Sequence, residues 1–542
     1  MGQGEADLVI SGGTVIDGTG APRRPADVAI VGERIAAVAT ADITGVNRID
    51  ADGLAVAPGF IDLHSHSDYL LLGNPCAQSK LLQGVTTEVG GNCGDSPAPM
   101  VDEIARDTSE WLAKFGVQAE WHDFAGFFSH LRRRGIAINF ACLVGHGNLR
   151  ATAMGYAGRT PSTEELDRMR AAATEAMRQG AVGISTGLAY PPGCYADAEE
   201  LIAVAGAVRP WGGIYVSHIR NEGDRLLGAV AEALEIGRRA RVAVHLSHHK
   251  VTDPWNWGRV TDSLAMIDAA RAGGLTVTAD QYPYIATSTG LAAALPHWAR
   301  EGGREAMLAR LRDPDTRARA VVDMRKRARA DDHWDRLVIA AVETERNRPC
   351  CGRSLAEIAR ERRASPPEAV CDLLLEEDAR VAVVRFAMCE QDVERVMRHP
   401  WVAVASDASA RATSGPLSEG RPHPRAFGTF PRVLGHYVRE RATLTLEEAV
   451  RKMTSLPASV LGIVDRGVLR EGARADVVVF DPRTIADRAT FEQPLEPPAG
   501  IHHVIVNGRL ALTNGSITEA RAGRVLGRIR RRVGDLAPTT SS

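Results

Sequence analysis

Two histidines follow a short apolar segment near the start of the chain. His64 and His66 are one residue apart in the stretch PGFIDLHSHSD (58–68). The apolar residues before them, preceded by Pro58 and Gly59, are typical of a buried strand. Because residues i and i+2 of a strand point to the same face, the two imidazoles can act together as metal ligands. An isolated pair can also be two surface histidines at a strand end, so the rest of the chain must decide.

Other strand-like segments also end in residues with metal or acid–base chemistry. Cys93 follows GVTTEVGGN (84–92), and His218 and His248 lie at or near the ends of two further segments. Asp407 ends WVAVASD (401–407). A lone cysteine in a glycine turn is often an inert small residue, a lone histidine is often only hydrogen-bonded, and Asp407 could cap a helix. Their recurrence at equivalent strand ends is hard to attribute to chance.

These residues need a framework in which several strand ends meet. Eight candidate strands alternate with helical patterns such as residues 162–180 and 224–240, which predicts an α/β fold with a (β/α)8 TIM-like barrel. The candidate strands are residues 59–66, 84–92, 137–146, 181–188, 213–219, 242–248, 275–282 and 401–407. Catalytic groups of such barrels lie at the carboxyl ends of the strands, where these side chains fall.

Both ends of the chain differ from the middle. Short apolar stretches separated by glycine and Asp-Gly turns predict strands in residues 5–57 and again in residues 467–518. We therefore expect a small β-sandwich domain built from residues 1–57 and 459–522, and a barrel over residues 58–458. The long gap before the last barrel strand predicts an inserted subdomain at about 290–400, and residues 523–542 form a polar, basic tail.

Composition excludes several classes of function. The 542 residues carry 65 basic and 67 acidic side chains, so nothing favours nucleic acid or a membrane as a partner. No apolar run is long enough to span a bilayer. Eight cysteines are not a disulfide framework in so long a chain, and the N-terminus lacks an apolar signal core. A cytoplasmic protein is expected, and a homo-oligomer is compatible with the sequence.

At the level of motifs the chain resembles the amidohydrolase superfamily, and more closely the N-acyl-D-amino-acid deacylases (D-aminoacylases). The motifs are HxH on the first strand, GNCG, GISTGLAYPPG, SHIRNEG, SHHK, DQYPY, RPHPRAFGTFPRVLG and ADVVVFDP, and they extend over nearly the whole chain. The resemblance implies zinc at the barrel mouth, held tightly by Cys93, His218 and His248. It assigns His64 and His66 to a second, weaker metal position.

The resemblance also implies the reaction. Metal-activated water hydrolyses the amide of an N-acyl-D-amino acid, and Asp407 serves as general base and then general acid. Strand four offers no bridging lysine, so Cys93 takes that role by resemblance. In SHHK we expect His248 rather than His249 to face the site, because consecutive strand residues point to opposite faces.

The substrate contacts are the least specific part of the prediction. A substrate carboxylate calls for a cation or hydroxyl partner. The residues matching family positions or lying in nearby loops are Lys250, Tyr282, Ser288, Tyr190, Arg421 and Arg425. Each could equally be a rim or packing residue. One departure is Ala408, where relatives usually have glycine, and a turn that needs positive φ would change the pocket there.

Three other functions compete with this one. The protein could hydrolyse another amide, such as a dipeptide, an N-acyl-L-amino acid, a carbamate or a cyclic imide, although the missing strand-four lysine argues against the last. Cys93 could be a nucleophile with a histidine base, in which case the enzyme would survive metal chelation. A non-catalytic binding protein would have no reason to carry the complete ligand set together with Asp407.

Overall fold

Eight parallel strands form a closed ring in the computed structural model, which describes residues 5–40, 43–100 and 102–527. The ring runs β8 (Phe60–Asp62), β9 (Val85–Gly90), β10 (Asn139–Cys142) continuing into β11 (Val144–Gly145), β12 (Gly183–Gly187), β13 (Ile214–His218), β14 (Ala243–Leu246), β15 (Val277–Gln281) and β19 (Val402–Val404). A parallel bridge from Ser65 to Ala408 and a bond from Asp407 N to His64 O (2.8 Å) join the first and last strands. The predicted barrel is confirmed, with strands shorter than expected.

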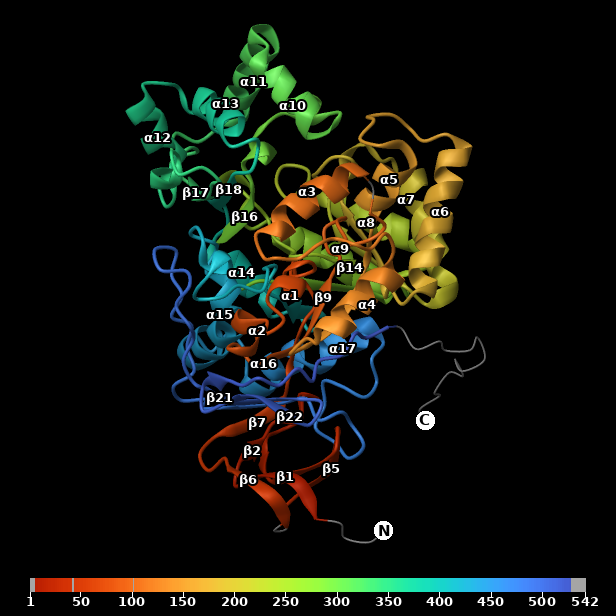
Figure 1. Cartoon of the computed structure of the whole chain (residues 1–542), viewed down its shortest axis with the longest axis vertical. Helices are drawn as coiled ribbons and strands as arrows, with labels where there is room; N and C mark the ends of the chain where they lie inside the picture. Colours follow the sequence, from red (N-terminus) through yellow and green to blue (C-terminus); the bar gives the residue numbers. More distant parts are fainter. Residues whose placement is uncertain (1–4, 41–42, 101, 528–542) are drawn as a thin grey trace.

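Helices surround this ring (Figure 1). They are α4 (Phe124–Arg134), α6 (Thr163–Arg178), α7 (Ala198–Val208), α8 (Leu226–Ala240), α9 (Val260–Ala272), α14 (Glu390–Met397), α16 (Leu446–Met453) and α17 (Ser455–Leu461). α6 begins with a capping box, in which Ser162 accepts from the amide of Glu165 and the Glu165 carboxylate accepts from that of Ser162. The apolar faces of these helices, except that of α17, pack on the strands in one continuous core, and α17 packs on strand residues in a separate cluster.

Further helices lie in the connections between these strands and helices. They are α1 (Leu70–Gly73), α2 (Gln78–Leu81), α3 (Asp102–Ala113), α5 (His146–Met154), α15 (Arg425–Arg432) and its π-helical continuation η8 (Val433–Glu440). α15 carries Arg425 at its first position, so the helix places this side chain next to the end of β19.

Strands from both ends of the chain form two further sheets, at the opposite end of the molecule from the helices α10–α13 (Figure 1). One contains β5 (Arg34–Ala39), β4 (Asp27–Val31), β1 (Ala6–Ser11) and β6 (Gly45–Asp50). The other contains β23 (Ser516–Ile517), β22 (Arg509–Thr513), β21 (Ile501–Val506), β20 (Val477–Phe480), β7 (Ala55–Pro58), β2 (Thr14–Val15) and β3 (Arg24–Pro25). Their inner faces share a core, as in the predicted β-sandwich.

One residue, Gly59, separates β7 of this sandwich from β8 of the barrel. A Cβ atom at Gly59 would lie 2.2 Å from Thr86 Cγ2, so only glycine allows the two sheets to follow each other so closely. At the other end, residues 523–526 return to the barrel, where Gly523 N donates to Ile136 O and Leu526 N to Phe140 O. The rest of the expected basic tail, residues 528–542, lies outside the described residues.

Between β15 and α14 the chain forms a separate layer above the barrel mouth (Figure 1), which we call the inserted segment (286–386). Its antiparallel sheet has the order β16 (Ala286–Gly290), β18 (Ala382–Phe386) and β17 (Leu337–Ala341). Its helices are α10 (Gly303–Arg312), α11 (Pro314–Arg327), α12 (Leu355–Arg362) and α13 (Pro366–Glu376). These elements bury an apolar core of their own, so the segment can be held rigidly over the site.

Candidate active site

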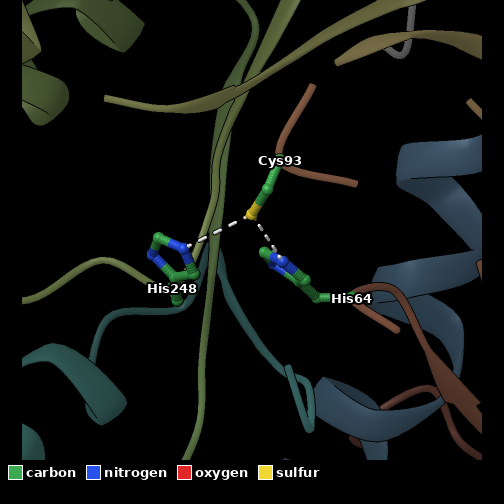
Figure 2. Close-up of side chains that lie close together, drawn as sticks. All are labelled: His64, Cys93 and His248. Carbon is green, nitrogen blue, oxygen red and sulfur yellow. Dashed lines mark hydrogen bonds between the residues drawn. The ribbon is translucent and has the colours of Figure 1, made fainter. Parts of the chain in front are cut away.

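The thiol of Cys93 is surrounded by imidazoles at the carboxyl ends of the barrel strands. Its Sγ atom lies 3.3 Å from His64 Nε2, 3.5 Å from His218 Nδ1 and 3.7 Å from His248 Nε2. Figure 2 shows His64, Cys93 and His248 pointing toward one another from three different segments. The structure thus brings together four residues that are far apart in sequence.

A second group adjoins this cluster and includes the carboxylate predicted to be catalytic. Asp407 Oδ1 lies 3.0 Å from His66 Nε2 and 3.4 Å from His64 Nε2. His64 therefore contacts both Cys93 and Asp407, and its ring stands between the two groups. Of the two consecutive histidines in SHHK, His248 joins the cluster, while His249 turns away and bonds to Ser263 Oγ (2.9 Å).

The spacing of these donor atoms suits zinc. Zinc bonded to nitrogen and sulfur at about 2.0–2.3 Å in a tetrahedron separates its ligand atoms by about 3.3–3.6 Å. The contacts of Cys93 with His64, His218 and His248 fall at or near this range. The nitrogens of His218 and His248, 2.9 Å apart, would separate slightly on binding an ion. One thiolate and several imidazoles are also the ligand types that zinc favours over magnesium or calcium.

Three residues of the cluster have backbone conformations that side chains other than glycine seldom adopt. The φ angles are +53° for Cys93, +35° for His248 and +49° for Asp407. Such strain is typical of functional sites and requires support from the surroundings. His248 N donates to Asp280 Oδ1 (2.7 Å) and Asp407 N to His64 O (2.8 Å), which hold two of these turns.

Ala408, where relatives usually have glycine, does not occupy a position that requires positive φ. The positive φ falls on Asp407, and Ala408 itself is not among the described residues with positive φ. Ala408 instead forms a bridge with Ser65 and packs against Ala426 and Phe427. An alanine is therefore accommodated without strain, and the expected change of the turn at this position is not seen.

The charges of the cluster stabilise one another. Burial raises the pKa of the Cys93 thiol, but His64, His218 and His248 outweigh it and hold the pKa well below its usual range. Burial likewise opposes ionisation of Asp407, yet Arg425 and the histidines keep its pKa well below the ordinary value. For His66, contacts with Asp407 and Cys93 overcome burial and raise the pKa to about 10. Cys93 and Asp407 are thus held as anions.

Two carboxylates behind the histidines were not predicted from the sequence. Asp280 Oδ2 accepts from His64 Nδ1 (3.2 Å) and His245 Nε2 (2.9 Å), which leaves Nε2 of His64 free to act as a ligand. Glu222 Oε1 lies 3.0 Å from His248 Nδ1 and orients that ring in the same way. Asp280 lies in the motif DQYPY and Glu222 in SHIRNEG. The presence of an acidic residue in each motif is the sequence signal that could have indicated these partners.

A cavity of about 1280 Å³ opens between the barrel mouth and the inserted segment. Five of the predicted substrate residues line it: Tyr190, Lys250, Tyr282, Ser288 and Arg425. Arg421 is not among the described residues lining the cavity. It is exposed and lies against Gly352 of the inserted segment, so its position does not support the predicted substrate contact.

Lys250 and Arg425 differ in their partners. Lys250 Nζ donates to Glu222 Oε1 (2.6 Å) and His248 O (2.8 Å), so its charge is already neutralised by the protein. Arg425 Nη1 forms an ion pair with Asp407 Oδ2 at 2.7 Å, and the guanidinium lies 4.7 Å above the ring of Tyr282, but its Nε is buried without a hydrogen-bond acceptor. The Tyr282 hydroxyl is buried and unpartnered as well. These donors face a cavity in which an anion would satisfy them.

A barrel of this topology, with a cysteine–histidine cluster and an adjoining aspartate, defines a class of metal-dependent hydrolase. A model described as the amidohydrolase family matches residues 48–511, and the chain belongs to this family. The motif resemblance is thereby confirmed at the level of the family.

Among its relatives is an N-acyl-D-glutamate deacylase of Alcaligenes xylosoxydans xylosoxydans, 42% identical over 97% of this chain and 97% of its own. A D-aminoacylase of the same organism is 40% identical over 96% of this chain and 98% of its own. The solved N-acyl-D-glutamate deacylase of Bordetella bronchiseptica, complexed with zinc and a phosphonate mimic of the tetrahedral intermediate, is 40% identical. It superposes with a TM-score of 0.81 over 97% of this chain and 100% of its own.

Within the described residues, no helix combines the length and the apolar character needed to cross a membrane.

Proposed function

We propose that this protein is a zinc-dependent deacylase of N-acyl-D-amino acids, which it hydrolyses to a carboxylate and a free D-amino acid. The observation that carries the proposal is the pair of buried donors without an acceptor, Arg425 Nε and the Tyr282 hydroxyl, beside Asp407. They lie next to the cysteine–histidine cluster, so a substrate carboxylate bound by them would bring its acylated nitrogen toward the donor atoms that suit zinc. The likeness to N-acyl-D-glutamate deacylase and D-aminoacylase supports the same assignment.

Cys93, His218 and His248 would hold the tight zinc, and His64 and His66 the second, weaker position. A zinc ion there supplies Lewis-acid polarisation of the amide carbonyl and acidifies water. His64 contacts both groups, so it could serve either position. A solved D-aminoacylase, 39% identical with a TM-score of 0.81, has a binuclear centre in which one metal activates and the second attenuates.

Asp407 is the residue of this chain suited to move protons. Its carboxylate is kept ionised by Arg425 and the histidines, so it can accept the proton of the attacking water. It can then transfer that proton to the nitrogen of the leaving amino acid. Arg425 and the Tyr282 hydroxyl bind the α-carboxylate, while Lys250, Tyr190 and Ser288 form the remaining walls. Asp280 and Glu222 keep the histidine rings oriented.

A panel of paired enantiomers tests the proposal. N-acetyl-D-methionine and N-acetyl-L-methionine are compared on one preparation whose zinc content is measured. Arg425 would fix the carboxylate of the substrate, and the cluster would fix its amide carbonyl. The side chain on the substrate's Cα atom can then point in only one direction, so the enzyme must prefer one enantiomer. The relatives indicate the D form. Faster turnover of the L form would leave only the broader assignment of a metal-dependent amide hydrolase, and full activity without metal would refute the zinc mechanism.

We also propose a cytoplasmic location for this protein. All eight cysteines are free, including Cys350 and Cys351, which fits a reducing compartment.

A further inference from the structure

His423 is a buried histidine that lies two residues before Arg425, and it is 3% exposed. Its Nδ1 accepts from Arg425 N (3.1 Å) and its Nε2 donates to Ala286 O (3.0 Å). One ring therefore bonds to the first residue of α15 and to the first residue of the inserted segment. This pattern requires a neutral ring with its proton on Nε2. Burial and the charge of Arg425 hold the pKa of His423 well below its usual range, so the ring stays neutral.

The start of α15 depends on His423 for its hydrogen bonds. The first amides of a helix have no acceptor within the helix, and Pro424 at the N-cap position has no side chain that can accept one. His423 takes this role twice, because its ring accepts from Arg425 N and its carbonyl from Ala426 N (3.2 Å). It thereby fixes the point from which the Arg425 side chain reaches Asp407.

The second bond of the ring holds one wall of the cavity. Ala286 is fully buried and begins β16. Further along this strand, Ser288 and Thr289 line the cavity, and Thr289 Oγ1 lies 3.0 Å from the hydroxyl oxygen of Tyr190. A bond from His423 to the first carbonyl of β16 therefore joins the cavity wall to the helix that carries Arg425.

Aromatic side chains fix the orientation of the His423 ring. Its centre lies 6.1 Å from that of Tyr282, 5.0 Å from that of Tyr284 and 5.0 Å from that of Phe491. The three interplanar angles lie between 62° and 86°, as in edge-to-face packing. Phe491 also packs on Phe386 of β18, with ring centres 4.7 Å apart. The ring cannot turn without displacing these neighbours, so its two hydrogen bonds keep fixed directions.

We propose that His423 is a positioning residue, which holds the guanidinium of Arg425 in a fixed position relative to the cavity wall formed by β16. The inference rests on the proposed function, because it takes Arg425 as the group that binds the α-carboxylate of the substrate. His423 is not among the described residues lining the cavity, so it acts through Arg425 and β16 rather than on the substrate itself. A small displacement of a group that orients a substrate is enough to weaken productive binding.

Two isosteric variants separate the two bonds of the ring. His423→Asn places an amide oxygen near the position of Nδ1, so it keeps the acceptor for Arg425 N and loses the bond to Ala286 O. His423→Gln places an amide nitrogen near the position of Nε2, so it keeps the donor to Ala286 O and loses the acceptor. In hydrogen–deuterium exchange, the Asn variant should speed exchange in residues 286–290, and the Gln variant in residues 425–428. Equal acceleration of both segments in both variants would show a general loss of stability and overturn the proposal.

The kinetic test uses N-acetyl-D-methionine and zinc-loaded protein. His423→Gln should raise KM roughly 2- to 10-fold, the effect of one net hydrogen bond, and His423→Asn should stay closer to the wild type. In an Arg425→Met background, His423→Gln should raise KM no further, because both changes act through one guanidinium. His503→Gln is the matched control, and it should leave KM unchanged. His503 is 8% exposed in β21, bonds to Thr513 Oγ1 (3.2 Å) and is not among the described residues lining the cavity.

The outcomes separate this proposal from the proposed function. A rise in KM for His423→Gln that persists undiminished in the Arg425→Met background would overturn the positioning role and leave the deacylase assignment intact. The complementary exchange pattern in a wild-type background that does not hydrolyse N-acetyl-D-methionine would instead contradict the proposed function, while the two bonds of His423 would still hold α15 and β16 in place.

Discussion

The Asp407 carboxylate faces two histidines on one oxygen and an arginine on the other. Oδ1 contacts His66 and His64, and Oδ2 contacts Arg425. These cations explain why the carboxylate is held ionised although it is buried. A group in this state can accept a proton, and it is fixed in place by a turn whose φ is +49°.

Replacing Asp407 with asparagine tests its role in proton transfer. Asp407→Asn keeps the shape of the side chain but removes the base, so kcat/KM should fall by about 10²–10⁴-fold. Zinc content should stay near that of the wild type, because Cys93, His218 and His248 are unchanged. Steady-state kinetics and elemental analysis on one sample check both statements. Undiminished turnover would remove Asp407 from the mechanism.

Arg425 should affect both the pH profile and the affinity for substrate. Its charge lowers the pKa of Asp407, so Arg425→Met should raise that pKa. Because a protonated Asp407 cannot accept a proton, the acid limb of kcat/KM should move to higher pH. KM should rise as well, since a carboxylate contact is lost.

The control for this variant is Arg432→Met on the same stretch of helix. Arg432 pairs with Asp487 at 3.1 Å and is not among the described residues lining the cavity. It should leave the acid limb in place. An unshifted acid limb in Arg425→Met would show that Arg425 does not control the ionisation that limits activity.

At the scale of elements, a fully buried lysine joins the first and last barrel strands. Lys80 Nζ, from α2, donates to Asp62 Oδ2 (2.8 Å), Ser406 Oγ (2.9 Å) and Ala408 O (2.8 Å). Asp62 Oδ1 in turn accepts from the amides of Ser406 (2.9 Å) and His64 (3.3 Å). One ammonium thus supports the turns that carry both His64 and Asp407.

Lys80→Met should destabilise the protein strongly. It leaves the carboxylates of Asp62 and Glu88 buried without their cation, and loss of one partner of a buried pair costs about 3–5 kcal/mol. The exposed pair of Arg178 with Glu175 offers a contrast, because solvent screens it and Arg178→Met should hardly change stability. Urea unfolding midpoints measure both. Similar midpoints for the two variants would show that the buried network contributes little.

The barrel and the cluster could be predicted from sequence because their signals are local. Short apolar runs mark the strands, and His64, Cys93, His218, His248 and Asp407 each follow one of them. Asp280 and Glu222 were missed as partners because nothing local distinguishes an acid behind a histidine from an ordinary one. The contact of Lys80 with Ser406 spans 326 residues and follows only from closure of the ring. The position of Arg421 against Gly352 of the inserted segment likewise depends on the path of its loop, for which the sequence holds no local signal.

The whole molecule should respond to zinc, because the predicted ligands come from different barrel strands. Cys93 follows β9, His218 ends β13 and His248 follows β14, so one ion would link distant parts of the ring. Binding to the native state alone stabilises it by RT ln(1 + [L]/Kd). Chelation should therefore lower the thermal midpoint, and added zinc should restore it.

Two cysteine variants make this thermal test specific. Cys93→Ala should abolish the zinc-dependent shift, because it removes the thiolate ligand. Cys371→Ala alters a buried thiol in α13 of the inserted segment and should lower the midpoint without changing its response to zinc. A full zinc response in Cys93→Ala protein would place the ion elsewhere.

The two ends of the inserted segment meet, since Ala286 of β16 is paired with Phe386 of β18. Antiparallel partners lie only about 4.5–5.5 Å apart, so the chain leaves the barrel and re-enters it at almost the same point. The residues between these two positions can therefore be exchanged as a unit, because the two points at which the segment joins the barrel keep the same separation. A gene in which codons 287–385 are replaced by those of a relative would keep the hydrolytic machinery and acquire the donor's choice of substrate.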